Sequence, residues 1–154
     1  MLAFVGISAV NLLLHADRQL GDLSPSFGAL ATLLYAAPGA RLSRPRNVLG
    51  GNLVGACVGM MCSLAVADAS HVWQNMFVPG AAVAVTILVN SLLDCTHPPS
   101  GAVALFAALP SFGRSVWYVL TPILLGDVVL LLVAIALNNV VGDPFFRTPA
   151  VKRK

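Results

Sequence analysis

Residues 46–67 read RNVLGGNLVGACVGMMCSLAVA, an apolar run whose single charge, Arg46, stands at its start. A helix rises about 1.5 Å per residue, so a helix over this run would be ~33 Å long and could cross the hydrocarbon core of a bilayer. Residues 116–137 form a second run of similar length. A third run, 77–93, would reach ~26 Å, which is also enough to span. The sequence therefore predicts an all-α membrane protein built around long spanning helices.

The composition of the whole chain agrees with this prediction. Of its 154 residues, 58% are hydrophobic and 10% are charged, and the mean hydropathy is +0.86. A soluble domain carries about 25% charged residues, so the outer surface of this chain must face a lipid bilayer. This excludes a soluble enzyme, a disordered linker and a nucleic-acid-binding protein. The three cysteines have no metal-binding spacing, and we expect no enzymatic activity, metal or cofactor.

The apolar runs follow a long–short–long order twice, over residues 1–67 and 77–138. The short runs, 26–38 and 100–110, would form helices of ~20 and ~17 Å, which cannot span as continuous helices. We therefore expect these two helices to be broken or re-entrant. The pattern predicts an internal duplication within one transmembrane domain, 1–138, followed by a basic C-terminal tail, 139–154.

The nine Lys and Arg residues bear on the topology. If the short runs do not cross the membrane, the basic residues divide five to four between the two sides. If all six apolar runs cross, they divide seven to two, with only Arg18 and Arg114 on one side. The positive-inside rule favours the second division. Three crossings per repeat would also invert the second repeat relative to the first.

The densest motif is Thr96-His97-Pro98-Pro99-Ser100-Gly101-Ala102. Its two prolines remove backbone donors and favour an extended approach to a helix that starts at Pro99 or Ser100. The positive end of that helix, with its free N–H groups, is suited to an anion. A similar start, Ser24-Pro25-Ser26-Phe27-Gly28, occurs in the first repeat, and in an inverted pair the two termini would meet near the midplane. The alternative is that both are capped helix starts at the membrane surface.

Two further residues are candidates for the substrate site. Arg46 begins a spanning helix, where its charge opposes the helix dipole, so an anion or an acidic partner would relieve the conflict. Alternatively, Arg46 sets the topology and binds lipid phosphate. Asn47 could line a path or bond another helix. The candidate substrate-binding residues are His97, Pro98, Pro99, Ser100, Gly101, Ser26, Gly28, Arg46 and Asn47.

These segments together resemble the HPP family of small integral membrane proteins, named for its His-Pro-Pro motif. The resemblance rests on HPPSGA at 97–102, FGA at 27–29 with AAP at 36–38, RPRNVLGG at 44–51 and PILLG at 122–126. It implies a transporter-like membrane protein, and plant members are associated with nitrite movement across the chloroplast envelope. Three positions depart from the family pattern: Arg44 replaces the common Gln, Asn52 the frequent His, and Asp127 an apolar or small residue.

His97 and Asp127 are candidates for proton transfer. Imidazole titrates near neutral pH when unperturbed, although His97 would equally serve to bond backbone groups freed by the two prolines. Asp127 stands inside an apolar run, where an ionised carboxylate costs roughly 2.5–3.5 kcal/mol, so it must face a cavity or a partner or be protonated. The structural alternative for Asp127 is a hydrogen bond to a neighbouring helix or to another subunit.

Gly51, Gly55 and Gly59 recur every four residues and flatten one face of the predicted helix. Small residues in this spacing allow another backbone to approach closely. We therefore expect helix packing here, within the chain or across a subunit boundary.

Two functions are consistent with these features. The first is an integral membrane carrier or channel-like protein for a small inorganic anion, with nitrite as the candidate that the resemblance implies. The second is a non-transporting accessory subunit of a larger membrane complex. A carrier should keep a polar path through His97, Arg46 and Asn47, whereas an accessory subunit need not. We expect a homo-oligomer or a subunit of a larger assembly, in the inner membrane of a plastid, a mitochondrion or a bacterium.

Overall fold

The computed structural model describes residues 2–16, 26–66, 72, 76–109 and 116–141, and the regular elements within them are all helical. The predicted all-α class is confirmed for this part of the chain. Arg18, Arg114 and the basic residues of the tail lie outside the described residues. The elements are α1 (Leu2–Ala16), α2 (Ser26–Ala36), η1 (Arg41–Ser43), α3 (Pro45–Ala65), α5 (Val78–Leu92), α6 (Pro99–Ala107), α7 (Val116–Tyr118), η2 (Val119–Leu124) and α8 (Leu125–Val141).

Among the described residues, two stretches of helix are long and apolar enough to cross a membrane. The first is α3, whose start agrees with the predicted run because Pro45 occupies the first helical turn, where its missing N–H is not needed. The second is Val116–Val140, which comprises α7, η2 and most of α8. The helix α8 extends to Val141, into the segment predicted as a tail.

The second long stretch is interrupted near its start. Thr121 has φ −138° and ψ 124°, and Pro122 follows it. Proline has no N–H with which to continue the helical ladder, and it disfavours helical geometry in the residue before it. The run 116–137 is therefore kinked at this point instead of forming one straight helix.

The two short apolar runs form regular but short helices. At about 1.5 Å per residue, α2 and α6 are about 17 and about 14 Å long, which is less than the thickness of the hydrocarbon core. The residues before α6, Cys95 to His97, adopt no regular structure. Pro98 has helical angles, φ −55° and ψ −39°, so the first of the two prolines is not extended as expected. The short helices are thus intact, and each is supported by a longer neighbour.

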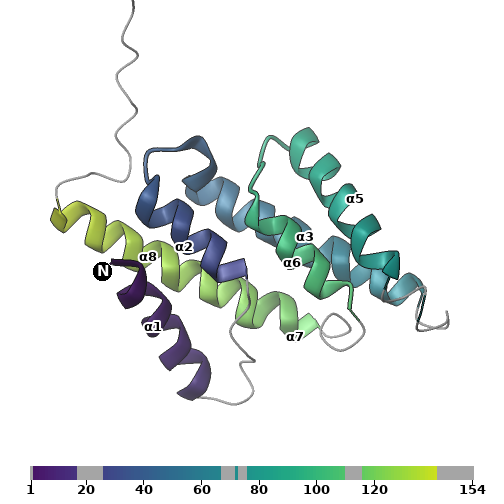
Figure 1. Ribbon diagram of the computed structural model, residues 1–154, viewed down its shortest axis with the longest axis horizontal. Helices are drawn as coiled ribbons and strands as arrows, with labels where there is room; N and C mark the ends of the chain where they lie inside the picture. The colour runs from purple at the N-terminus through teal and green to yellow at the C-terminus, as the bar shows by residue number, and fades with distance from the viewer. Residues whose placement is uncertain (1, 17–25, 67–71, 73–75, 110–115, 142–154) are drawn as a thin grey trace, which may run out of the picture.

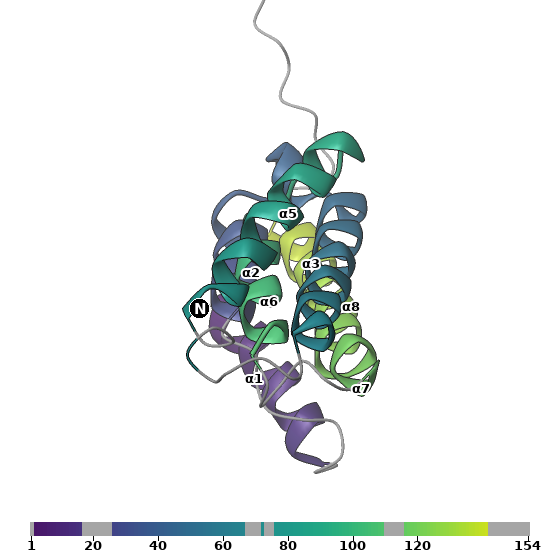
Figure 2. The same ribbon diagram turned by 90° about the vertical axis from the view of Figure 1, so that its right-hand side faces the viewer.

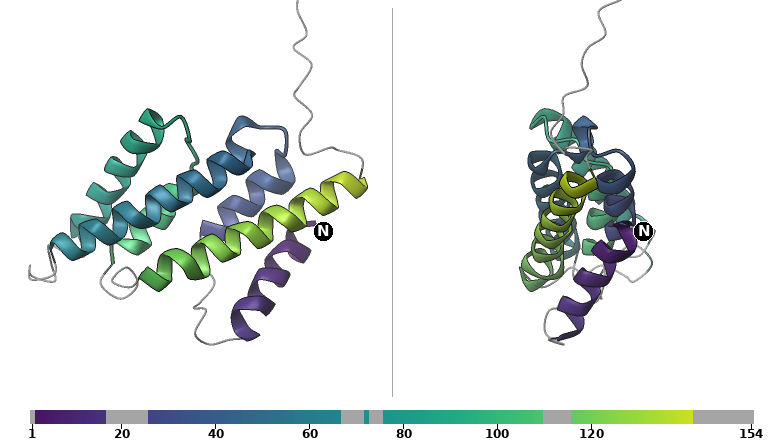
Figure 3. Two further views of the ribbon diagram at one scale, coloured as in Figure 1. Left: turned by 180° about the vertical axis from the view of Figure 1, so that it is seen from behind. Right: turned by 90° about the vertical axis from the view of Figure 1, so that its left-hand side faces the viewer.

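Each long helix packs against short helices from the other half of the chain. α3 contacts α5 and α6, and α8 contacts α1 and α2. α3 and α8 run in opposite directions, as do α2 and α6 (Figures 1 and 3). In the side view of Figure 2, α3 and α8 form one layer, and the shorter helices lie against it.

The apolar core divides between the same two groups of helices. One cluster joins α1, α2 and α8 with one residue of α3, and a smaller cluster joins α3, α6 and η2. Large apolar side chains also cover the outside, for example Phe4, Leu12, Leu92 and Val140, which are 74–83% exposed. A soluble protein rarely presents such an exterior, but it is the surface that lipid requires.

Candidate functional site

The glycine face of α3 receives the His-Pro-Pro turn and α6. A Cβ at Gly51 would lie 2.6 Å from the Cβ of His97, and a Cβ at Gly55 would collide with the backbone oxygen of Ser100. Gly59 is enclosed in the same way, one turn further along α6. These contacts leave no space for side chains, so the two backbones approach closely. The structure places all three glycines in an α3–α6 contact within this chain.

His97 is held inside the protein as a neutral imidazole. Its side chain is 1% exposed, and Nδ1 lies 2.9 Å from the carbonyl oxygen of Leu42. Because a carbonyl can only accept, Nδ1 carries the hydrogen. Burial lowers the pKa of His97 to about 4, although the bond to Leu42 acts in the opposite direction. Nε2 is buried without a hydrogen-bond partner among the described residues, and it is an acceptor, not a positive charge for an anion.

Ser100 and Asn90 form a polar link between α6 and α5. Asn90 Nδ2 donates to Ser100 Oγ at 2.8 Å, and Ser100 Oγ donates to the carbonyl of His97 at 2.6 Å. The N–H groups of Ser100 and Gly101 donate to the carbonyls of His97 and Pro98. The sequence predicts these two N–H groups to be free for an anion, but in the structure they are engaged within the turn.

Arg46 and Asn47 hold the connection that precedes the motif. Arg46 Nη2 donates to the carbonyl of Leu93 at 3.0 Å, and Asn47 Nδ2 donates to the carbonyl of Thr96 at 2.9 Å. Two of the residues predicted to bind substrate therefore already bind the backbone of the 93–98 connection. Arg46 is exposed, whereas Asn47 is buried, so only Arg46 keeps donors available on the surface.

An ion pair joins the same two parts of the chain. Arg41 of η1 pairs with Asp94, and their side chains are 62% and 65% exposed. An exposed pair of this kind contributes about 0–1 kcal/mol to stability. It adds little to the buried hydrogen bonds that fix the connection.

Asn52 and Asp127 form a buried pair between α3 and α8. Both side chains are 0% exposed, and Asn52 Nδ2 lies 2.9 Å from each carboxylate oxygen of Asp127. In the sequence both residues are departures from the family pattern, and nothing in the family resemblance connects them. A signal was available, because each directly follows a glycine in a long apolar run, as Gly51-Asn52 and Gly126-Asp127. In the described residues, Asp127 makes no hydrogen bond to His97, the other candidate for proton transfer.

The candidate residues of the first repeat lie on α2, which packs on α8. Ser26 is buried, and Gly28 is exposed with open space around the position of a Cβ. Between them, the ring of Phe27 fills the space beside Gly126. The structure therefore joins the start of α2 to α8, and the His-Pro-Pro turn to α3.

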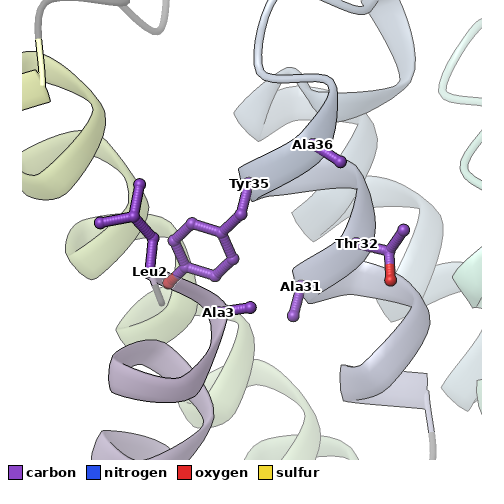
Figure 4. Close-up of a pocket in the computed structure, with 6 residues that line it drawn as sticks. All are labelled: Leu2, Ala3, Ala31, Thr32, Tyr35 and Ala36. Atoms are coloured by element: carbon purple, nitrogen blue, oxygen red, sulfur yellow. The ribbon is translucent and has the colours of Figure 1, made fainter.

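Two other features bear on where a ligand could bind among the described residues. An open pocket of about 390 Å³ lies between α1 and α2. In the described part of the chain, no three His, Cys, Asp or Glu side chains gather as a metal site would need. The pocket has no charged lining residue, and Figure 4 shows its six residues, Leu2, Ala3, Ala31, Thr32, Tyr35 and Ala36.

Comparisons with known proteins agree with the sequence resemblance. A family model described as the HPP transmembrane region matches residues 1–145. A transmembrane protein of Dictyostelium discoideum is 31% identical over 143 residues, which cover 89% of this chain and 49% of that protein. A second transmembrane protein of the same organism is 30% identical over 142 residues, which cover 89% of this chain and 45% of that protein. The chain thus spans about half the length of these relatives. No solved structure matches.

Proposed function

The chain belongs to the HPP transmembrane family, and we propose that it is a carrier or channel-like protein for a small inorganic anion, with nitrite as the candidate substrate. It is an integral membrane protein, which we assign to the inner membrane of an organelle or a bacterium. The proposal includes no enzymatic step and no cofactor. The anion would be held between the positive ends of α2 and α6, and Arg46 would attract it.

The placement of the two short helices is the observation that supports this proposal. In Figure 1, α2 and α6 both begin near the middle of the molecule and run away from each other. The positive ends of both helix dipoles therefore face the same central region. Secondary transporters commonly bind anionic groups at the N-termini of short or broken helices near the midplane.

We further propose that residues 1–67 and 77–138 are inverted repeats. A half-turn about the line of sight in Figure 1 would bring α1, α2 and α3 close to the places of α5, α6 and α8. The contacts follow the same relation, because α3 packs on α5 and α6 while α8 packs on α1 and α2. Two inverted halves around one central site are the usual basis of alternating access.

Arg46 is the residue through which the proposal can be tested. Its guanidinium has five N–H donors, and one nitrogen binds the carbonyl of Leu93. The remaining donors stand at the exposed start of α3, beside the connection that leads into α6. The charge of Arg46 would attract the anion toward the helix ends, and this role is separate from its structural bond to Leu93.

The variant Arg46→Gln should lower nitrite uptake into proteoliposomes at least about tenfold, equivalent to about 1.4 kcal/mol. Glutamine keeps a polar side chain with an amide donor but has no charge. Arg46→Lys should retain most of the uptake, and Arg44→Gln, which removes a neighbouring exposed charge, serves as the control. Uptake by Arg46→Gln at the wild-type rate would remove Arg46 from the site.

One observation favours the second candidate, an accessory subunit of a larger membrane complex. Asn47, Asn52 and Asn90 each bind a group of this same chain, and His97 binds the carbonyl of Leu42. Side chains that would line a polar path are thus used to hold the fold. Absence of any anion uptake by the folded wild-type protein would favour this second function.

A further inference from the structure

The contact between α3 and α8 contains two equivalent dipeptides, Gly51-Asn52 and Gly126-Asp127. Each glycine lies against the start of a short helix from the other half of the chain: Gly51 against His97, just before α6, and Gly126 against the ring of Phe27 in α2. The second residues of the two dipeptides face each other, and Asn52 donates a hydrogen bond to Asp127. The pair therefore joins the two halves beside both proposed anion-binding helix ends.

The hydrogen bonds of this pair are incomplete as they stand. Asn52 Nδ2 donates to both carboxylate oxygens, while Asn52 Oδ1 is buried and has no partner among the described residues. A buried polar atom without a partner is costly. A proton on Asp127 would supply the missing donor, because a carboxylic acid and an amide can form two opposed hydrogen bonds. Only the terminal torsion of Asn52, which is broad for this residue type, would have to rotate.

We infer that Asp127 binds an exchangeable proton and that Asn52 couples its presence to the contact between α3 and α8. With the proton bound, the acid and the amide make two hydrogen bonds and hold the helices together. When the O–H bond breaks, the proton passes to water, the electron pair stays on the carboxylate, and Asn52 Oδ1 loses its donor. The helices then separate at this point. The further step, in which proton release accompanies anion movement, rests on the proposed carrier function.

The surroundings of Asp127 offer no other described partner for the proton. α8 is packed by α1, α2, α3 and η2, and the hydrogen bonds of Asp127 in the described residues go to Asn52 alone. Arg46 bonds Leu93, and Tyr35 lies against Gly6 of α1. The titratable or charged residues on the elements around α8 are His15, Tyr35, Arg46, Cys57 and Cys62, and η2 has none.

Spin labels on α3 and α8 would test this inference without any assumption about transport. Leu53 and Val128 directly follow the two paired residues, and both are 39% exposed. The full chain, with Cys57→Ala, Cys62→Ala and Cys95→Ser, would carry labels at Leu53→Cys and Val128→Cys. The distance between the labels would be measured in lipid over the pH range in which the protein stays folded. We expect a shorter distance at acidic pH and a longer one at alkaline pH.

Two further variants identify the group that responds. Asp127→Asn keeps a pair that can make two hydrogen bonds but cannot titrate, so its distance should stay at the acidic value at every pH. The exchange Asn52→Asp with Asp127→Asn moves the acid to α3 and should restore the pH response. A wild-type distance that does not change with pH, or a response that persists in Asp127→Asn, would overturn the inference. A pH response in a protein that takes up no nitrite would support the proton site at Asp127 and contradict the proposed carrier function.

Discussion

At the scale of single residues, polar side chains near the His-Pro-Pro turn serve the backbone around it. The connection before α6 has carbonyls that no regular helix can satisfy. Arg46 and Asn47 each donate to a carbonyl of this connection, and His97, which lies within it, donates to the carbonyl of Leu42 in η1. Buried backbone carbonyls need hydrogen-bond donors. These side chains therefore stabilise the turn, and the donors that they use for this are not available to a ligand.

His97 gives a prediction about pH. Its pKa is lowered from 6.5 to about 4 by burial, so the unfolded chain binds a proton more readily than the folded protein does. The stability that this histidine contributes is present above pH 6.5 and is lost as the pH falls from 6.5 through about 4, by roughly 3 kcal/mol at most. Thermal unfolding in detergent at several pH values would measure the loss.

The control for this prediction is His97→Asn, whose side-chain amide nitrogen lies near the position of Nδ1 and can donate to the carbonyl of Leu42 but does not titrate. The difference in melting temperature between wild type and this variant should change between pH 6.5 and pH 4, in the direction that favours the variant as the pH falls. A constant difference would mean that His97 does not titrate in this range.

At the scale of helices, the close contact between α3 and α6 explains how a nine-residue helix is held in place. Such a short helix is not stable by itself. The glycines of α3 let it approach until backbone meets backbone, and Asn90 ties its first turn to α5. The position of α6 is therefore decided by α3 and α5, not by its own length.

The variant Gly55→Ala should destabilise the protein, because the new Cβ would collide with the backbone oxygen of Ser100. Overpacking of this kind costs about 1–3 kcal/mol. The matched control is Gly80→Ala on α5, where nothing lies within 4 Å of the added Cβ and alanine is favoured over glycine by about 0.5–1 kcal/mol. Melting temperatures in the same detergent should therefore move in opposite directions; equal shifts would disprove the tight contact at Gly55.

At the scale of the whole molecule, two groups of helices depend on each other. α8 is covered by helices from the first half of the chain, and α3 by helices from the second half. Each long helix is therefore buried largely by helices of the other half. The exposed apolar exterior then faces lipid or a protein neighbour.

The mass of the native particle separates the two proposed functions. An autonomous carrier, extracted in mild detergent at native abundance, should run as a small homo-oligomer by light scattering or native mass spectrometry. Its subunit mass is 16.0 kDa. A fixed place in a much larger complex, with stoichiometric partners, would instead support the accessory-subunit function.

The sequence alone determined the class of the protein and the positions of its helices. The run 46–67 predicted α3, and the prolines at 98 and 99 predicted the irregular approach to α6, because hydropathy and proline stereochemistry act over neighbouring residues. The kink at Thr121 was available from Pro122 by the same reasoning and was missed. The membrane setting also follows from composition alone.

Only the tertiary structure decided which polar residue meets which. Asn52 was noted as a departure from the family and Asp127 as a lone acid, yet they lie 75 positions apart and are joined by hydrogen bonds. Asn47 reaches Thr96, and His97 reaches Leu42, over similar separations. No local pattern encodes such pairs, because they depend on how helices from the two halves of the chain pack. The partners of the candidate site residues were therefore fixed by packing, whereas the helices that carry them were fixed by local hydrophobicity.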